Sequence, residues 1–443
     1  MKKLVILLLM LPALLKAQDI ATKADEYLTA ISKQKKFSGT VLIAKGGKVL
    51  LNKGYGWADA EKKVYNGPET EFRIGSVSKQ FTATVIMKLA EEGKLKVTDP
   101  LTKFISHYPK GDSITIHHLL SQTSGIQNFT NLPEFKSKWI AEPATLSQTI
   151  THFKSLPLNF RPGEKYQYSN SNYILLSFIA EKAGEKPLNE LLNDYIFTKA
   201  GMQNSGLDAN NRMSDKKATG HNSLEGDKPQ IAEFNDMSVP SGAGAMYATT
   251  GDLYRWDRAL YSNKIINEDT KSKMFTINKG NYGYGWMMGK TFGHNEISHG
   301  GAISGFLSNI ARFPADDACI IVLSNTAFAP MAQLTTALSA ILFGEKYTIP
   351  AEKKIVKVEQ KILDQYAGEY QLNPAFTIQV TTENGKIFGQ ATGQPKFEIF
   401  PTSNTEFFLK VVDANITFIK DEAGMVTEMI LNQGGKVNLK KIR

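Results

Sequence analysis

The order of strand-like and helical segments is the feature that most constrains how this chain can fold. Residues 37–45 and 48–58 alternate like two strands, and the Gly46-Gly47 pair between them suits a tight hairpin turn. From about Asp99 to Met237 the spacing of apolar residues is mostly helical. Strand-like segments and a final amphipathic helix then follow at 296–299, 305–313, 319–325 and 331–343. This order predicts a sheet assembled from both ends of a domain, with a helical insertion between them and a cleft at their junction.

The N-terminal segment has the pattern of a secretory leader. Residues 1–17 begin with two lysines after the initiator, continue with an apolar run from Leu4 to Leu15, and end on Ala17. The alternative is a membrane anchor, but a spanning helix needs about 20 apolar residues, and nothing after Gln18 approaches that length. The sequence therefore predicts a signal peptide cleaved after Ala17, no membrane span, and a periplasmic or secreted protein.

The remaining sequence divides into a large domain, a linker and a small domain. The main domain is expected over 18–346. Residues 347–362 are charged, contain Pro350 and lack a clear period, which is typical of a linker. From 363 to 443, short strand-like runs alternate with turn signals, which predicts a small antiparallel β domain.

Charge and cysteine content exclude several classes of function. The formal net charge of the 443 residues is +9, of which three lysines lie in the leader, and the other basic residues are interspersed with acidic ones. This pattern is typical of a solvated surface, so we expect no nucleic-acid partner. The single cysteine, Cys319, lies in an apolar segment and is expected to be a small buried hydrophobic residue. The seven histidines show no clustered ligand spacing beyond His117-His118, and we expect no metal or organic cofactor.

Ser76 and Lys79 stand three residues apart at the start of a strongly apolar helix. This spacing puts both side chains on one helix face. A serine hydroxyl becomes a good nucleophile when a neighbouring group takes its proton, and a lysine whose pKa is lowered by burial can do so. Taken alone, Ser76 could equally be a helix N-cap. Two further Ser-x-x-Lys patterns, at 32–35 and 214–217, lie in polar segments and are expected to be accidental.

Two other patterns could complete such a site. In Tyr168-Ser169-Asn170, a tyrosine close to an ammonium could act as a base, and the asparagine amide could hold a polar substrate group. In His299-Gly300-Gly301, the glycines allow a substrate to approach a strand edge, and the amide of Ala302 could donate to an oxyanion. Each has a simpler interpretation when taken alone: a polar turn that caps a helix at Asn172, and a turn that contains a histidine.

Together and in this order, the three patterns resemble the serine β-lactamase and penicillin-binding-protein superfamily. The resemblance is closest to the class C β-lactamase-like branch, which also contains D,D-peptidases, D-aminopeptidases and esterases. It extends over about 37–343 and is carried by the segments 72–76, 119–125, 168–170, 240–244 and 299–301. It implies the α+β fold of that superfamily, an antiparallel sheet flanked by helices with a helical insertion.

The resemblance also implies roles for four residues of the first two patterns. Ser76 would be the acylated nucleophile and Lys79 its proton partner. Tyr168 would be the base and proton shuttle, and Asn170 would bind the substrate amide.

The third pattern would supply the substrate-binding edge. His299 occupies the place where many relatives have a lysine, and Gly301 and Ala302 continue the edge. The amides of Ser76 and Ala302 would form the oxyanion hole. Because a histidine supplies a cation for a substrate carboxylate only when it is protonated, this departure weakens the case for an efficient β-lactamase.

Two other residues depart from the family pattern or match it by chance. Gln122 stands where many relatives have a histidine in the 119–125 segment, and we interpret it as structural. Glu185 begins a Glu-x-x-Leu-Asn match to the deacylating glutamate of class A β-lactamases. It follows Tyr168 too closely for that role and is interpreted as a surface acid near a helix N-terminus.

The sequence thus predicts an exported serine hydrolase that forms an acyl-enzyme at Ser76 on an amide, β-lactam or ester carbonyl. Its partner would be a small-molecule or peptide substrate, with a cell-wall peptide among the candidates. One alternative is a penicillin-binding receptor or scaffold that acylates once or not at all. Another is a member of the fold that has lost acylation.

Overall fold

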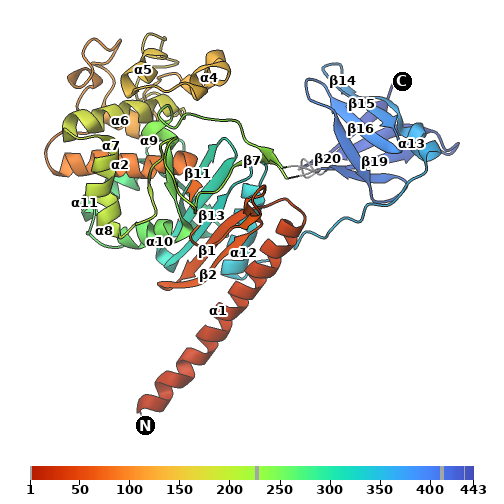
Figure 1. The fold of residues 1–443 in the computed structure, drawn as a ribbon, viewed down its shortest axis with the longest axis horizontal. Coiled ribbons are helices and arrows are strands. Elements are labelled where there is room, and N and C mark those ends of the chain that lie inside the picture. Colours follow the sequence, from red (N-terminus) through yellow and green to blue (C-terminus); the bar gives the residue numbers. More distant parts are fainter. Residues whose placement is uncertain (1, 225–228, 410–413, 434) are drawn as a thin grey trace. The chain divides into compact units, whose positions relative to one another are not determined.

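The computed structural model describes residues 2–224, 229–409, 414–433 and 435–443, with side chains described from Gln18 onward. The chain divides into two compact units, Met1–Pro350 and Ala351–Arg443 (Figure 1). The boundary between them falls within the segment 347–362.

The first unit is built on one six-stranded antiparallel sheet with the strand order β10-β11-β12-β13-β1-β2. Its strands are β1 (Gly39–Lys45), β2 (Lys48–Tyr55), β10 (Met287–Thr291), β11 (His294–Ile303), β12 (Phe306–Phe313) and β13 (Ala318–Ser324). The early strand β1 lies beside the late strand β13, with Ile43 opposite Ile320. The prediction of a sheet assembled from both ends of the domain is therefore confirmed.

The β1–β2 hairpin forms where the glycine pair predicts it. Gly46 and Gly47 have φ angles of +60° and +69°, which two-residue hairpin turns of this hand require and which glycine adopts freely. The expected second strand, 48–58, is shorter than predicted. It is interrupted at Gly56, whose φ is +66°, and a short strand β3 (Trp57–Asp59) follows.

Both faces of the sheet are buried, because alternate residues of each strand point to opposite sides. On β1, Val41 and Ile43 pack into one hydrophobic cluster, and Leu42 and Ala44 pack into another. The first cluster includes Leu334 of helix α12 (Met331–Phe343) and buried residues in the C-terminal half of helix α1 (Lys2–Lys33). The second is covered by the helical region (Figure 1). The result is a three-layer arrangement with the sheet in the middle.

The helices of the first unit have the bounds α1 (Lys2–Lys33), α2 (Ser78–Glu91), α3 (Ile116–Leu120), α4 (Pro133–Ser137), α5 (Leu146–Thr151), α6 (Asn170–Gly184), α7 (Leu188–Leu192), α8 (Thr198–Ala200), α9 (Ser241–Gly244), α10 (Thr250–Ala259), α11 (Glu268–Met274) and α12 (Met331–Phe343). A π-helical turn, Asn193–Phe197, joins α7 to α8. Among the residues described, we find no helix with both the length and the apolar character needed to cross a membrane.

Outside the six-stranded sheet, short strands pair with one another between the helices of the first unit. They are β3 with β4 (Val64–Tyr65), β9 (Met246–Ala248) between β5 (Phe72–Arg73) and β6 (Gly206–Leu207), and β7 (His221–Ser223) with β8 (Gln230–Ile231). The pairing of β5 with β9 leads the chain directly into the Ser76 segment.

The second unit is a closed antiparallel barrel of eight strands. Its strands are β14 (Gly368–Asn373), β15 (Phe376–Glu383), β16 (Lys386–Ala391), β17 (Phe397–Pro401), β18 (Glu406–Leu409), β19 (Ala414–Lys420), β20 (Val426–Asn432) and β21 (Lys436–Lys441). The prediction of a small antiparallel β domain is confirmed. The sequence did not predict that its strands close into a barrel. One expectation was wrong: the start of the strand-like region is helix α13 (Gln360–Tyr366), because Leu363 and Tyr366, three residues apart, both reach the barrel core.

Candidate active site

Ser76 lies in a single 3₁₀ turn, Gly75–Val77, that leads directly into α2. Two serine hydroxyls fix this turn: Ser78 Oγ donates to the Gly75 carbonyl at 2.7 Å, and Ser308 Oγ of β12 donates to the Ile74 carbonyl, also at 2.7 Å. The Ser76 side chain itself stays partly exposed. The turn that carries Ser76 is therefore held from both sides, while Ser76 itself remains partly exposed.

Strand β11 approaches this turn closely because two glycines leave room. Gly75 has a φ of +49°, and a Cβ atom there would lie 2.7 Å from the Ala302 amide nitrogen. A Cβ atom on Gly301 would lie 2.1 Å from the Ile74 carbonyl oxygen. The backbone of Ala302 thus lies against the turn that carries Ser76, which is the juxtaposition that a two-amide oxyanion hole needs.

Lys79 is fully buried beneath Ser76. Its Nζ atom lies 3.0 Å from Ser76 Oγ, 2.8 Å from Asn170 Oδ1 and 2.7 Å from the Ala243 carbonyl oxygen. None of these partners carries a negative charge. Burial therefore lowers the pKa of Lys79 well below its usual range.

The partners of Lys79 also determine how a neutral amine would be oriented. A neutral amine has two N–H groups and one lone pair, and the carbonyl oxygens of Asn170 and Ala243 can only accept. With both N–H groups donated there, the lone pair of a neutral amine would face Ser76 Oγ, 3.0 Å away. This arrangement allows Lys79 to act as the base for Ser76.

Tyr168, in the loop before α6, and Asn170, the first residue of α6, reach the same centre. The ring centroid of Tyr168 lies 5.0 Å from Lys79 Nζ. Burial raises the pKa of Tyr168, although the neighbouring Ser76 hydroxyl opposes the shift, so the phenol stays protonated at neutral pH. Its buried hydroxyl makes no direct hydrogen bond among the described residues. The geometry therefore favours Lys79 as the base and Tyr168 as a proton donor.

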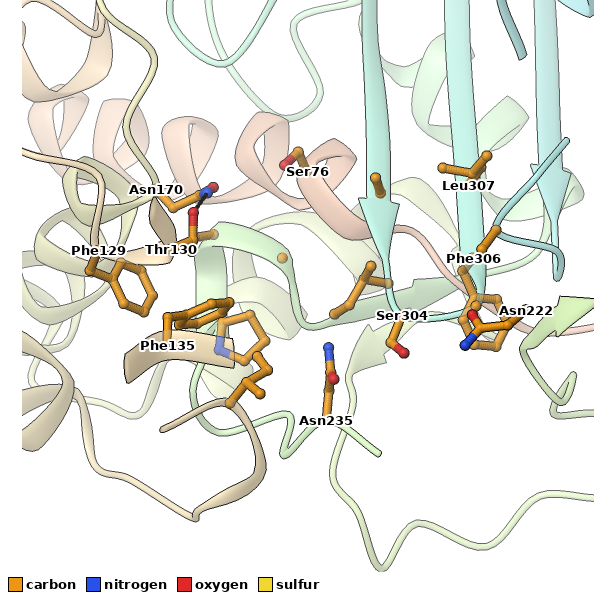
Figure 2. Close-up of a pocket in the computed structure, with 18 residues that line it drawn as sticks. Ser76, Phe129, Thr130, Phe135, Asn170, Asn222, Asn235, Ser304, Phe306 and Leu307 are labelled. Carbon is orange, nitrogen blue, oxygen red and sulfur yellow. Dashed lines mark hydrogen bonds between the residues drawn. The ribbon is translucent and has the colours of Figure 1, made fainter. Parts of the chain in front are cut away.

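The helix that carries Asn170 begins earlier than the pattern suggested. Asn170 is the first residue of α6, and Ser169 precedes it in extended conformation, so the helix does not begin at Asn172. The Asn170 side chain bridges two groups: Oδ1 accepts from Lys79, and Nδ2 donates to Thr130 Oγ1 at 3.1 Å (Figure 2).

His299 lies in the middle of β11, so the interpretation as a turn histidine is wrong. Its Nδ1 donates to the Gly300 carbonyl at 2.6 Å, because that oxygen can only accept. Its Nε2 then accepts from the Tyr282 hydroxyl at 3.1 Å. Burial lowers the pKa of His299 to about 4, so the ring is neutral at physiological pH and offers no cation to a substrate.

A cavity of about 410 Å³ opens beside Ser76. Ser76 and Asn170 form part of its wall, with Phe129 and Phe135 on one side and Ser304 and Phe306 on the other (Figure 2). Of the predicted residues, Ser76, Asn170 and Ala302 line this cavity, while Lys79, Tyr168, His299 and Gly301 lie around it without lining it.

Two residues of the site were missed by sequence reasoning. The Ala243 carbonyl holds Lys79, and the 240–244 segment that contains it was noted only as part of the family resemblance. Thr130 holds Asn170 across 40 residues of sequence, and no local pattern marks it.

Gln122 and Glu185, interpreted from the sequence as a structural residue and a surface acid, both lie outside the site. Gln122 Oε1 accepts from the Ser169 amide at 3.0 Å and from Asn172 Nδ2 at 2.6 Å, so it fixes the Tyr168 loop, and its structural interpretation is confirmed. Glu185 is exposed and follows the end of α6, which confirms that it is a surface acid.

Comparison with known proteins agrees with this geometry. The family profile described as Beta-lactamase matches residues 24–342, and a domain of unknown function, DUF3471, matches residues 352–442. A penicillin-binding protein of Bacillus subtilis (strain 168) is 30% identical over 433 residues, which cover 92% of this chain and 95% of the relative.

Solved structures show the same fold. A penicillin-binding protein from Bacillus halodurans superposes with a TM-score of 0.64 at 27% identity, covering 70% of this chain and 98% of that one. A D-amino acid amidase from Ochrobactrum anthropi SV3 superposes with a TM-score of 0.65 at 19% identity, covering 74% and 99%, and shares the fold alone. The chain thus belongs to the beta-lactamase family of serine hydrolases, among relatives named penicillin-binding proteins.

Proposed function

We propose that this protein is an exported serine hydrolase that forms an acyl-enzyme at Ser76 on an amide, β-lactam or ester carbonyl. The observation that carries this proposal is the 3.0 Å contact between Ser76 Oγ and Lys79 Nζ, whose other two partners can only accept hydrogen bonds. The cavity of about 410 Å³ beside Ser76 gives a carbonyl access to that hydroxyl.

The first half-reaction makes the acyl-enzyme. Ser76 Oγ attacks the carbonyl carbon while Lys79 Nζ takes the hydroxyl proton. The amides of Ser76 and Ala302 stabilise the oxyanion that develops. The bond to the leaving nitrogen or oxygen then breaks, and the leaving group takes a proton from the Lys79 ammonium, with the Tyr168 hydroxyl as the relay.

The second half-reaction regenerates the enzyme. A water molecule attacks the ester carbonyl and transfers its proton to the neutral Lys79 amine. The bond to Ser76 Oγ breaks, and this oxygen recovers the proton from Lys79. The products are the acid and the original leaving group, so no further reactant is required.

Export is part of the proposal. The first buried residue with a described side chain is Ile20, which packs with Leu28 and Ile31 against the sheet. Cleavage after Ala17 would leave these contacts intact. Mass spectrometry of the N-terminus of protein recovered from the periplasm or medium of an expressing bacterium should find Gln18 as the first residue; an intact Met1 in the cytosol would contradict export.

A substitution with a matched control tests the chemistry. Ser76→Ala should abolish hydrolysis of a nitrophenyl ester, a chromogenic cephalosporin or a D-Ala-D-Ala peptide, whichever the wild type turns over. Ser214→Ala, which changes a serine of the same Ser-x-x-Lys pattern in a surface loop, should retain it. Equal turnover by Ser76→Ala would refute the assignment. A stable stoichiometric adduct at Ser76 without turnover would instead identify a receptor.

A further inference from the structure

The cavity beside Ser76 is lined by uncharged residues. Figure 2 draws its 18 lining residues, and among these described residues there is no aspartate, glutamate, lysine, arginine or histidine. Phe129, Phe135 and Phe306 supply aromatic surface. The polar groups are amides and hydroxyls, and the amide of Asn235 points into the space between the aromatic side chains (Figure 2).

Lys79 and His299, the two basic side chains assigned to the site, are already engaged. Lys79 is fully buried and uses its hydrogens on Asn170 and Ala243, and His299 is neutral with both ring nitrogens bonded. Neither side chain can offer a charged donor to a substrate in the cavity.

An adjoining cavity that shares Ser304 and Phe306 with this one does contain basic side chains. Each of them is paired with an aspartate, at distances of 3.0 Å for Lys62–Asp59, 2.8 Å for Arg73–Asp208 and 3.6 Å for Lys217–Asp208. A substrate carboxylate would therefore have to compete with these aspartates for a cation.

This lining determines which substrates can enter without a large loss of hydration. A carboxylate that enters an uncharged cavity gives up water and gains no cation in return. A neutral ester or amide gives up much less, and its carbonyl and N–H groups can bond to the asparagine amides. Its apolar part can pack against the phenylalanine rings.

We propose that the site selects neutral acyl compounds, namely esters or amides with an apolar group and no carboxylate near the scissile bond. β-Lactams and peptides with a free C-terminal carboxylate would then be poor substrates. This inference deepens the proposed function and rests on it.

A matched pair of esters tests the inference on the full-length mature protein. Both are phenyl esters of phenylacetylglycine; the leaving phenol carries a meta carboxylate in one and a meta carboxamide in the other. We expect kcat/KM for the carboxamide ester to be at least tenfold higher, after correction for the spontaneous hydrolysis of each. Equal values, or a preference for the carboxylate, with turnover that depends on Ser76 would overturn the inference and leave the proposed function standing.

Two variants at Asn235 test whether the lack of a cation in the cavity causes the preference for the neutral ester. Asn235→Lys places a cation in the cavity and should narrow the difference between the two esters at least threefold, whereas Asn235→Gln should leave the ratio near that of the wild type. A ratio unchanged by the lysine would overturn the inference. Because the wild-type ratio is measured independently, the test survives a variant that fails to fold. Turnover of neither ester, or turnover that persists in Ser76→Ala, would refute the proposed function and the inference with it.

Discussion

At the residue scale, the proposed chemistry depends on Lys79, because burial without a carboxylate partner lowers the pKa of its ammonium well below the usual range and so favours the neutral amine. When this amine is neutral, its two N–H groups donate to the carbonyl oxygens of Asn170 and Ala243. Its one lone pair then faces Ser76 Oγ. A guanidinium would keep the positive charge but could not accept a proton.

Lys79→Arg should therefore lower kcat/KM by on the order of 10²–10⁴, the range that a positioned base contributes. Lys88→Arg provides the control, since Lys88 lies on the same helix and pairs with Glu91 at 2.8 Å, away from Ser76. Steady-state kinetics with a nitrophenyl ester distinguishes the two. Full activity in Lys79→Arg, with the fold verified by circular dichroism, would show that another group takes the proton.

The lowered pKa of His299 predicts how the free energy of unfolding depends on pH. Burial lowers its pKa from 6.5 to about 4, so between these values the unfolded chain binds a proton that the folded protein does not. The stability of the fold relative to the unfolded chain is therefore highest above pH 6.5, as far as His299 is concerned. This part of the free energy of unfolding is lost as the pH falls from 6.5 toward 4. Between pH 7.5 and pH 5.0 the loss amounts to about 2 kcal/mol.

Urea unfolding of the wild type and His299→Gln at both pH values measures this difference. The glutamine variant should lose less stability on acidification, by about 2 kcal/mol, whatever its stability at pH 7.5. Comparing the change with pH, and not the stability itself, removes the contributions of the other histidines. Parallel loss in both proteins would show that His299 is not held neutral in the fold.

At the scale of elements, the contact between β11 and the turn that carries Ser76 depends on Gly301. A Cβ atom there would lie 2.1 Å from the Ile74 carbonyl oxygen, and both are backbone, so the strand and the turn would have to separate. The neighbouring Gly300 is a matched control, because its nearest new contact would be 3.7 Å away.

Gly301→Ala should therefore destabilise the protein by about 1–3 kcal/mol, as overpacking does, and should lower kcat by moving Ala302 away from Ser76. Gly300→Ala should change stability by less than about 1 kcal/mol and keep kcat near the wild-type value. Thermal unfolding and ester hydrolysis on the same samples provide both readouts. A harmless Gly301→Ala would show that the close approach is not needed for the reaction.

The sequence predicts the elements better than the contacts between them. The alternation of Val41 to Ala44 and the Gly46-Gly47 pair define the first hairpin, because side-chain direction and turn geometry are local properties. Ser76 and Lys79 come together for the same reason, since one helical turn separates them. Thr130, in contrast, meets Asn170 only through the tertiary fold, and no local spacing could reveal it.

The protonation states could not be predicted from the sequence either. The family resemblance implied that Tyr168 acts as a base and that His299 supplies a pH-dependent cation. Both depend on how deeply each group is buried, and burial keeps the Tyr168 phenol protonated and the His299 ring neutral. The lowered pKa expected for Lys79 follows from the same physical cause.

At the scale of the whole molecule, the two units have separate hydrophobic cores, and every residue assigned here to the site lies in the first unit, Met1–Pro350. In the second unit, Phe418 is buried at the centre of the barrel. Its ring stacks on Tyr366 with 4.2 Å between centroids and meets Phe407 edge-on.

Phe418→Ala should therefore destabilise the barrel by about 3–5 kcal/mol, the usual cost of removing a buried phenylalanine side chain. It should leave kcat/KM for a small nitrophenyl ester within about twofold of wild type, because the groups that would perform the reaction are fixed by the first unit's own packing. Met425→Ala, at a position that is 66% exposed, serves as the control with little effect on either quantity. Hydrogen exchange resolved along the chain reports the barrel separately from the first unit. A tenfold fall in kcat/KM in Phe418→Ala, with exchange in the first unit unchanged, would show instead that the barrel takes part in catalysis.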